Sequence, residues 1–508
     1  MTREKLKPKK ILMIADLGAS APKLIVSFKR NQTSHLILDS RTLKIPAFLF
    51  DKHREKEKEK QFVDEQLASE DAFLQLADDE EHYWVFGSLS KHFTSKERLD
   101  KNATKYQLGA VKILCGLGVL IQQEKLKYRN FDLDLCVLLP VDEFGYSEMF
   151  FKYFKRISKK WWFRGVEYSC SLRTTKVKRE GASTLNYLLN HQDYQHQYQG
   201  KTIGLIMLGY RNLSFFLVKN GKAEVKESPV LGFHKCIENI CDKNGAIKAT
   251  ELNAALANAY YSLLPHELEK VPGEIYDELQ GLYNRFHDLN FNATAEKQQL
   301  EEGKLFKYEF SDYSDDSDHL KVHIKRKGKS PEFKNCEEIK ELIKTQEPYN
   351  AEQELDNLIH DIDKEIKDYG KEFQLWLEQY LKDIDKLIVI GGASIFLYSW
   401  ITDFCNRYDL LYIDQQKSPF PPPYESSGYN HNLDRKVIHI DSLPRLREEL
   451  VKDFEFDAKD KNYSSIPLRF LDCYCFYKLC LKEIQEEEKA QRKQKKEQER
   501  QQKEIMDF

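Results

Sequence analysis

The segment ILMIADLGASAPKLIVSF, residues 11–28, joins two strand-like apolar runs through a short turn of small residues. The first run ends on Asp16, Gly18 and Ser20 lie in the turn, and Lys23 opens the second run. Glycine has no Cβ, so backbone N–H groups in such a turn can approach a phosphate closely. A carboxylate there suits a hydrated Mg²⁺, and a lysine suits phosphate charge. The alternative is an ordinary β-hairpin with turn-forming residues.

Two further segments place a glycine at the end of an apolar run. VIGGASIFL, residues 389–397, reads as a strand, a Gly391-Gly392 turn and a helix, which is a junction where ligands dock at the carboxyl end of a sheet. GLIMLGYRNLSFFLVKNG, residues 204–221, reads as two strands linked near Gly209. A plain β–α turn and a structural hairpin are the alternatives for these two segments.

Composition narrows the class of protein. A chain of 508 residues is too long for one ordinary core and indicates two or more domains. Its net charge of -3 gives no case for general attraction to nucleic acid or membrane. The ten cysteines form no C-x-x-C pair, so a reduced, cytoplasmic setting is expected, with Cys473 and Cys475 as buried thiols. No apolar run approaches the roughly 18 residues of a membrane span.

The order and spacing of the three glycine turns resemble the actin-like ATPase superfamily, and within it the ParM/StbA-type bacterial plasmid-segregation actins. DLGASAPK resembles the first phosphate loop and LIVIGGAS the adenosine loop, and two strand–glycine–strand turns lie about 190 residues apart. The resemblance implies an α/β, actin-like (RNase H-like) fold of two domains. Each domain would be a mixed five-stranded sheet flanked by helices, with the nucleotide in the cleft between them.

The resemblance also implies a division of the chain into two main domains and a charged end. We expect residues 51–82 to be a surface insertion or flexible arm, and residues about 296–350 to be a polar insertion with a loop or small hairpin. The last stretch is expected to be a charged helix or disordered, and a partner-binding tail is the alternative. The expected boundaries are domain I at 1–185, domain II at 186–410, a loop and C-terminal return to domain I at 411–481, and a tail at 482–508.

What the resemblance implies for the site can be stated residue by residue. The first phosphate loop would use Asp16, Gly18, Ser20 and Lys23, with Asp16 also at the metal. Gly209, Arg211 and Asn212 would cover the other side of the phosphates, and Gly391, Gly392 and Ser394 would border the nucleoside. In KVKREGASTL, Glu180 occupies the place of the glutamate that orients the attacking water. A helix-start carboxylate is its alternative role.

The second phosphate loop departs from the family pattern. Met207 stands where the family has an aspartate that helps to hold Mg²⁺ or its waters, and Tyr210-Arg211-Asn212 replaces a Gly/Thr-rich turn. Either Asp16 holds the metal by itself, or hydrolysis is slow, or nucleotide binding is lost. Arg211 would meet phosphate charge directly, unless it is a surface turn residue.

The resemblance therefore predicts a cytoplasmic protein that binds ATP or GTP with Mg²⁺ and forms homopolymer filaments. As a possible ATPase it would act in plasmid or DNA segregation, with DNA reached through an adaptor protein and with no membrane partner. The first alternative is a pseudo-ATPase of the same fold that acts as a scaffold. A small-molecule kinase of the superfamily is a weaker alternative, because no motif for a sugar or acid pocket is evident. A chaperone would need a substrate-binding β domain, which the charged segment after residue 410 does not provide.

Overall fold

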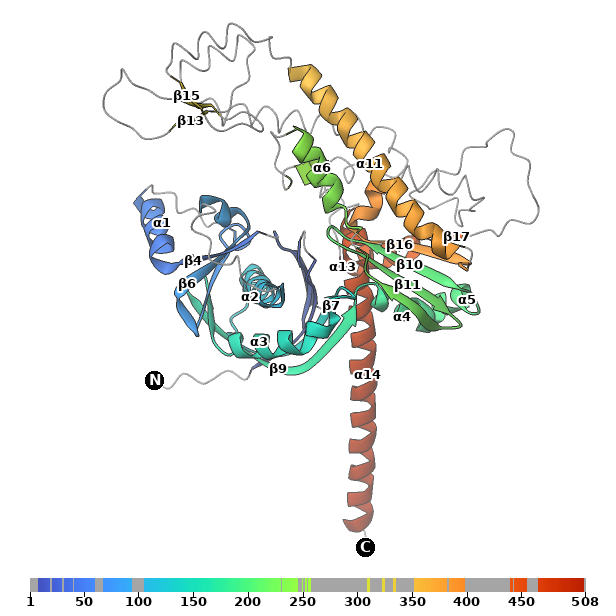
Figure 1. Cartoon of the computed structure of the whole chain (residues 1–508). Coiled ribbons are helices and arrows are strands. Elements are labelled where there is room, and N and C mark those ends of the chain that lie inside the picture. The colour runs from blue at the N-terminus through green and yellow to red at the C-terminus, as the bar shows by residue number, and fades with distance from the viewer. Residues whose placement is uncertain are drawn as a thin grey trace, which may run out of the picture.

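The computed structural model places two large β-sheets on either side of a long C-terminal helix (Figure 1). None of the helices in the part of the chain that the structure describes is long and apolar enough to cross a membrane. The described residues are 8–18, 21–29, 32–39, 41–59, 67–93, 105–229, 231–244, 249, 252–253, 255–256, 308–310, 322–324, 332–334, 351–381, 383–397, 439–441, 443–454 and 465–506.

The first sheet contains nine strands, in the order β3-β2-β1-β7-β9-β8-β5-β6-β4. Along its first five strands, β1 is antiparallel to β2 and β2 to β3, whereas β1 is parallel to β7 and β7 to β9. The strands are β1 (Lys9–Asp16), β2 (Lys23–Lys29), β3 (Gln32–Ile37), β4 (Thr42–Pro46), β5 (Phe73–Leu76), β6 (Asp79–Phe86), β7 (Asn130–Leu139), β8 (Trp161–Phe163) and β9 (Val166–Arg179).

The second sheet has five strands, in the order β12-β11-β10-β16-β17. Its directions repeat those of the first five strands of the other sheet: β10 is antiparallel to β11 and β11 to β12, and β10 is parallel to β16 and β16 to β17. The two sheets therefore share one topology. The strands are β10 (Ile203–Leu208), β11 (Leu213–Lys219), β12 (Lys222–Glu227), β16 (Lys386–Ile390) and β17 (His439–Asp441).

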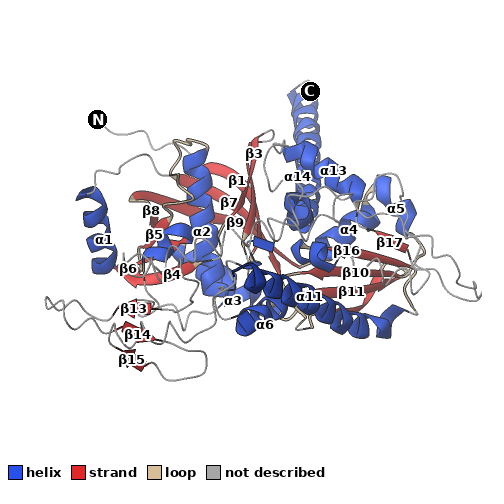
Figure 2. Ribbon diagram, turned by 90° about the horizontal axis from the view of Figure 1, so that it is seen from above, coloured by secondary structure: helices blue, strands red, loops and turns tan. Residues whose placement is uncertain are grey.

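Strands β1 and β7 are apolar along nearly their whole length because both faces of the first sheet are covered. Successive side chains of a strand point to opposite faces, so Met13 enters one core and Ile14 the other. Helix α2 (Lys105–Gln123) and α3 (Ser147–Ile157) pack in the first of these cores (Figure 2).

The core on the other face is shared by the two sheets. It combines Leu12 of β1 with Leu205 of β10 and with the first turns of α14 (Ser465–Met506). Helices α4 (Ala182–Asn190), α5 (Gln192–Tyr198) and α13 (Pro444–Phe454) contribute to the same core. The outer face of the second sheet is covered by α6 (His234–Asn244) and α11 (Ala351–Leu381) (Figure 2).

Helix α14 is the longest element, with 42 residues. Its residues Phe470–Tyr477 are buried in the shared core, and Cys473 and Cys475 are buried there as expected, although on a helix and not a strand. Beyond Lys482 the helix extends away from the body (Figure 1), and most of the side chains described there are exposed. The predicted charged tail is thus helical as far as Met506.

Several expectations differ from the structure. The first sheet has nine strands rather than five, because β4, β5, β6 and β8 extend it beyond β9. Residues 51–59 belong to helix α1 (Ala47–Glu59), whereas residues 73–82 contribute β5 and the start of β6, so this second part is not a surface arm. The apolar alternation FLQL and the pairing of β6 with both β4 and β5 draw this charged region into the sheet.

Two expectations for the second half of the chain also differ from the structure or fall partly outside the described residues. Strand β17 pairs with β16, so the C-terminal segment first adds to the second sheet before α13 and α14 reach the shared core. In the polar region about 296–350 the structure describes a small antiparallel sheet of β13 (Tyr308–Phe310), β14 (Val322–Ile324) and β15 (Glu332–Lys334). The rest of that region, and residues 411–438, lie outside the described residues.

Candidate functional site

The hairpin of β1 and β2 carries a buried ion pair at its turn end. Asp16 and Lys23 are register partners, and the Lys23 Nζ lies 2.6 Å from the Asp16 Oδ2. The backbone N–H of Gly18 donates to the other carboxylate oxygen, Oδ1, at 2.8 Å. Asp16 is 1% exposed and Lys23 is 8% exposed. Two charges out of contact with water need a specific geometry to be tolerated, and the turn supplies it.

Gly18 lies directly above this ion pair. A Cβ at this position would lie 3.0 Å from the Lys23 Nζ and 3.3 Å from the Asp16 Oδ1. A larger residue would therefore crowd the two charged groups. Ser20, the fourth residue predicted for this loop, lies outside the described residues.

In the hairpin of β10 and β11, uncharged residues occupy the positions that correspond to Asp16 and Lys23. Met207 pairs with Ser214 across the hairpin, as Asp16 pairs with Lys23, and the two residues are separated by the same interval. Met207 and Ser214 are both buried. No cation faces a carboxylate at this pair, so the second hairpin offers neither a metal ligand nor a lysine for phosphate.

The turn of the second hairpin is held by backbone contacts. The N–H of Gly209 donates to the carbonyl of Asn212 at 3.1 Å, and the N–H of His234 donates to the carbonyl of Tyr210 at 2.7 Å. A Cβ at Gly232 would lie 1.9 Å from the carbonyl oxygen of Arg211. The side chain of Arg211 is exposed. The turn backbone is therefore packed against the start of α6.

The turn after β16 is explained by packing against β10. Gly391 has φ of +99°, and a Cβ there would lie 2.3 Å from the carbonyl oxygen of Leu208. The Ser394 hydroxyl donates to the carbonyl of Gly391 at 2.7 Å, and Ser394 is buried. Gly392–Leu397 forms a short 3₁₀ helix, in the place where a helix was expected. Gly391 and Ser394 therefore hold the turn after β16 against β10.

Glu180 links the two hairpins. It follows β9, and its backbone N–H donates to the carbonyl of Leu139 at 2.9 Å. Its carboxylate accepts a long hydrogen bond of 3.5 Å from the Ser214 hydroxyl. Burial raises the pKa of Glu180 well above its usual value and the charge of Asp16 raises it further, while Lys23 lowers it. Glu180 thus lies near the ion pair of one hairpin and the serine of the other.

Asp472 of α14 was not predicted, and it holds the start of α4. Its carboxylate accepts from the backbone N–H of Gly181 at 2.7 Å and of Thr184 at 2.8 Å, and from the Thr184 hydroxyl at 2.9 Å. The first N–H groups of a helix have no partner within the helix, so Asp472 caps α4 from a distant segment. Burial raises its pKa to about 6. The signal in the sequence is one aspartate within the apolar run FLDCYCFY.

The described residues can be tested for fit to a nucleotide with Mg²⁺. Within the described ranges, no group of three or more His, Cys, Asp or Glu side chains could hold a metal ion. Mg²⁺ commonly uses one or two carboxylates, phosphate oxygens and several waters, which Asp16 fits by itself. The ammonium of Lys23 fits phosphate charge, and Gly18 lacks a Cβ that would obstruct the approach of a ligand. The first hairpin therefore fits the ligand, whereas Met207 of the second does not contribute to it.

Comparison with protein-family models gives no match, and comparison with curated proteins gives no match either. Solved structures do align with the chain. The apo ParM of psk41 is 12% identical over 90% of this chain and 97% of its own, with a TM-score of 0.41. Bacillus thuringiensis ParM with ATP is 10% identical over 93% and 100%, with a TM-score of 0.43. A ParM of a 15-stranded filament from Clostridium botulinum is 15% identical over 77% and 91%, with a TM-score of 0.42.

These scores are low, so the assignment of the fold depends on the sheets themselves. Two sheets with one strand order and one set of directions flank a shared core. This agrees with the actin-like arrangement of two similar α/β domains. The structure therefore shows a mixed α/β fold with one five-strand arrangement in both sheets, consistent with the actin-like resemblance of the sequence.

Proposed function

We propose that the chain is an actin-like nucleotide-binding protein that assembles into filaments, with the phosphates held at the first hairpin. The observation that supports this most directly is the buried ion pair of Asp16 and Lys23 under Gly18, with Glu180 nearby. A buried lysine with a short glycine turn suits a phosphate group. One protein aligned above contains ATP and another is a filament.

In this proposal Lys23 exchanges its contact with Asp16 for a contact with a phosphate oxygen. Its ammonium has three N–H donors, so it can contact a phosphate oxygen while Asp16 turns toward a hydrated cation. Mg²⁺, when bound, would neutralise phosphate charge. Asp16 would hold a metal-bound water, and Gly18 would let the backbone approach the phosphate.

Glu180 is proposed to position the attacking water. Its raised pKa makes it a stronger base than an exposed glutamate, and the Ser214 hydroxyl fixes one side of its carboxyl group. Asp472 fixes the backbone of the next residue, Gly181, through a 2.7 Å hydrogen bond. Asp472 would therefore act as a positioning residue for Glu180.

The other predicted site residues, in the second hairpin and in the turn after β16, are proposed to contact the nucleotide less directly. Arg211, with its exposed side chain, could reach a phosphate from the second hairpin, while Asn212 and Gly209 shape that turn. Gly391, Gly392 and Ser394 would border the nucleoside as part of the rigid turn after β16. A filament of this protein would carry DNA through an adaptor, because the net charge of -3 offers no general attraction for DNA.

The experiment is sedimentation with Mg-ATP, with Mg-GTP and without nucleotide, while phosphate release is followed in the same sample. We expect nucleotide-dependent pelleting and phosphate release, and we expect Asp16→Asn to abolish both. Asp134→Asn is the matched control, because Asp134 is a buried carboxylate on the neighbouring strand β7 that pairs with Arg173 away from the turn. Loss of activity in both variants would point to a folding effect and remove the support for Asp16.

A scaffold without turnover is the second candidate, and Met207 with Ser214 favours it. The second hairpin has neither the carboxylate nor the ammonium group that the first hairpin carries at the paired positions. Pelleting that is unchanged by nucleotide and by Asp16→Asn, with no phosphate released, would favour the scaffold over the nucleotide-driven filament.

A further inference from the structure

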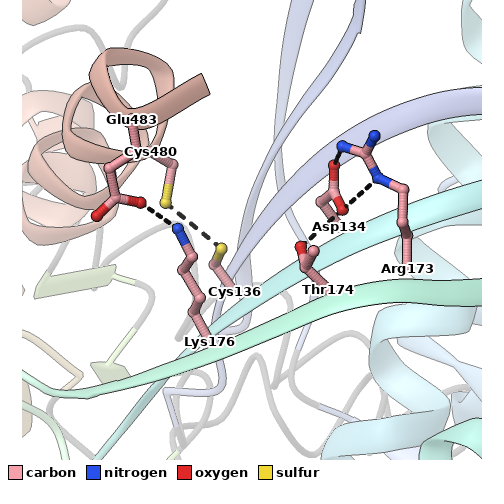
Figure 3. Close-up of polar contacts among 7 residues, drawn as sticks. All are labelled: Asp134, Cys136, Arg173, Thr174, Lys176, Cys480 and Glu483. Atoms are coloured by element: carbon pink, nitrogen blue, oxygen red, sulfur yellow. Dashed lines mark hydrogen bonds and ion pairs between the residues drawn. The ribbon is translucent and has the colours of Figure 1, made fainter. Parts of the chain in front are cut away.

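We propose that Cys136 and Cys480 form a redox-active thiol pair, a modification site at which a peroxide creates a reversible disulfide between the first sheet and helix α14. The two sulfur atoms lie 3.5 Å apart, although the residues are 344 positions apart in the sequence (Figure 3). This proposal does not depend on nucleotide binding.

The surrounding contacts hold both sulfur atoms in place. Cys136 lies on β7 and its register partner on β9 is Lys176, which forms an ion pair with Glu483 of α14 (Figure 3). Glu483 is one helical turn after Cys480, on the same face. The Lys176–Glu483 pair therefore joins α14 to β9, whereas a disulfide would join α14 to the neighbouring strand β7.

A second polar cluster braces β7 two residues earlier. The Arg173 Nε donates to the Asp134 Oδ1 at 2.8 Å, and the Thr174 hydroxyl donates to the same oxygen at 2.6 Å (Figure 3). Asp134 and Cys136 share one face of the strand. The cluster fixes the register of β7 and β9 next to the thiol pair.

The electrostatics distinguish Cys480 from the other buried thiols. The hydrogen bond with Cys136 and the ammonium groups of Lys176 and Lys178 lower the pKa of Cys480, whereas burial and Glu483 raise it. The same bond and burial raise the pKa of Cys136. By contrast, burial raises the pKa of Cys473 and Cys475 on the same helix. Cys480 is therefore the thiolate nucleophile and Cys136 the resolving thiol.

Access to the pair requires movement of one ion pair. Cys136 and Cys480 are nearly inaccessible, at 1% and 2% exposed, but the side chains of Lys176 and Glu483 above them are 40% and 51% exposed. Exposed ion pairs contribute little to stability, so transient separation of Lys176 from Glu483 opens a path for a molecule as small as hydrogen peroxide.

The reaction balances with peroxide as the oxidant. The Cys480 thiolate attacks a peroxide oxygen, the O–O bond breaks, and the hydroxide released takes the proton lost by Cys480 to form water. The Cys136 thiol then attacks the sulfenic sulfur, the S–S bond forms, and the S–O bond breaks with loss of a second water carrying the Cys136 proton. Two thiols lose two electrons and the peroxide gains them. A dithiol reductant restores both thiols by exchange.

The disulfide would anchor α14 at the point where it leaves the shared core. Tyr477 is the last of a continuous buried run on α14, Cys480 is one turn later, and from Lys482 the helix is mostly exposed. Asp472, which caps α4, lies eight residues earlier on the same helix. Oxidation would thus fix the helix that contacts both sheets.

The test is to oxidise the full-length protein with hydrogen peroxide, block remaining thiols with N-ethylmaleimide, digest it and map linked peptides by mass spectrometry. We expect one monomeric cross-link between the peptides of Cys136 and Cys480, reversed by dithiothreitol. It should be absent in Cys136→Ala and in Cys480→Ala, and retained in Cys241→Ser, whose thiol is more accessible. Hydrogen exchange at α14 amides near Cys480 should slow by at least about tenfold on oxidation.

The wild-type map decides the question even if a variant fails to fold. Labelling of both thiols after oxidation, oxidation of Cys480 to sulfinic acid without a cross-link, or a cross-link of either residue to a different cysteine would each overturn the proposal. A disulfide-linked dimer on a non-reducing gel, lost in Cys480→Ala, would overturn it as well.

Discussion

The two hairpins that face the shared core have the same backbone and opposite chemistry. In the first, Asp16 and Lys23 form a buried ion pair at the end of the strands, and in the second Met207 and Ser214 occupy the paired positions. The two sheets have the same order and directions, so the backbone does not require charge there. A buried ion pair is costly to desolvate and is weak evidence for stability. The first hairpin thus carries a costly charged pair that the shared backbone does not require, which supports the ligand role proposed for it.

The largest effect is expected from removing one charge of the first hairpin. Lys23→Met would leave Asp16 buried without its cation and lower the free energy of unfolding by about 3–5 kcal/mol. Chemical denaturation followed by circular dichroism measures this. A loss below about 1 kcal/mol would mean that water reaches Asp16 and that the pair is not a buried site.

A double variant separates stability from function in the same hairpin. Asp16→Met with Lys23→Ser copies the pair found in the second hairpin, so we expect it to recover most of the stability lost in Lys23→Met. Nucleotide binding, measured as a shift in Tm with Mg-ATP, should remain lost. Recovery of both would show that the charges are dispensable and would favour the scaffold.

The second-largest loss of stability is expected at Gly391, in the turn after β16 that packs against the second hairpin. Gly391→Ala forces a side chain to φ of +99° and within 2.3 Å of the Leu208 carbonyl oxygen, so we expect a loss of about 2–4 kcal/mol. Gly221→Ala is the matched control, because φ is +74° there and no atom lies within 4 Å. It should cost only about 1 kcal/mol in the same denaturation measurement. Equal losses would mean that backbone conformation alone matters at Gly391.

A smaller effect is expected at Asp472, where α14 contacts the segment between the hairpins. Its folded-state pKa of about 6 lies above the ordinary 3.8, so the folded state binds this proton more tightly. The group therefore favours folding most at low pH, and this contribution is lost as the pH rises from about 4 to about 6.

Comparing Asp472→Asn with the wild type across that range measures the titration of Asp472 together with its effect on Glu180, because the charge of Asp472 also raises the pKa of Glu180. We expect the stability difference to change by on the order of 1 kcal/mol between pH 4 and pH 7. Thr184→Val removes one hydrogen bond but keeps the carboxylate, so it should retain the pH dependence. A difference that is flat with pH would show that Asp472 titrates normally.

The smallest effect is expected in the second hairpin. The bond from the Ser214 hydroxyl to Glu180 is long, at 3.5 Å. Ser214→Ala should lower the free energy of unfolding by no more than about 0.5 kcal/mol, which denaturation at neutral pH can measure. A loss of stability comparable to that of Lys23→Met would contradict the proposal that the two hairpins differ in how strongly their paired residues contribute.

Local patterns in the sequence predict much of the backbone. Apolar runs ending on Asp16 and near Gly209 predict the two hairpins, and the amphipathic segment SEMFFKYFKRI predicts α3 over its observed span. Asp16 and Lys23 are register partners in the first hairpin, because antiparallel register depends on residues close in the chain. The roles of these residues toward a nucleotide stay predictions.

Only the tertiary structure decides which distant residues meet. Asp472 reaches Gly181 across 291 positions and Cys480 reaches Cys136 across 344, and neither interval leaves a periodic signal. The extension of the first sheet to nine strands and the pairing of β17 with β16 depend on sheet edges. Hydrophobic periodicity specifies which face of an element is buried, but not its partner. That choice is made by packing between elements that no local pattern connects.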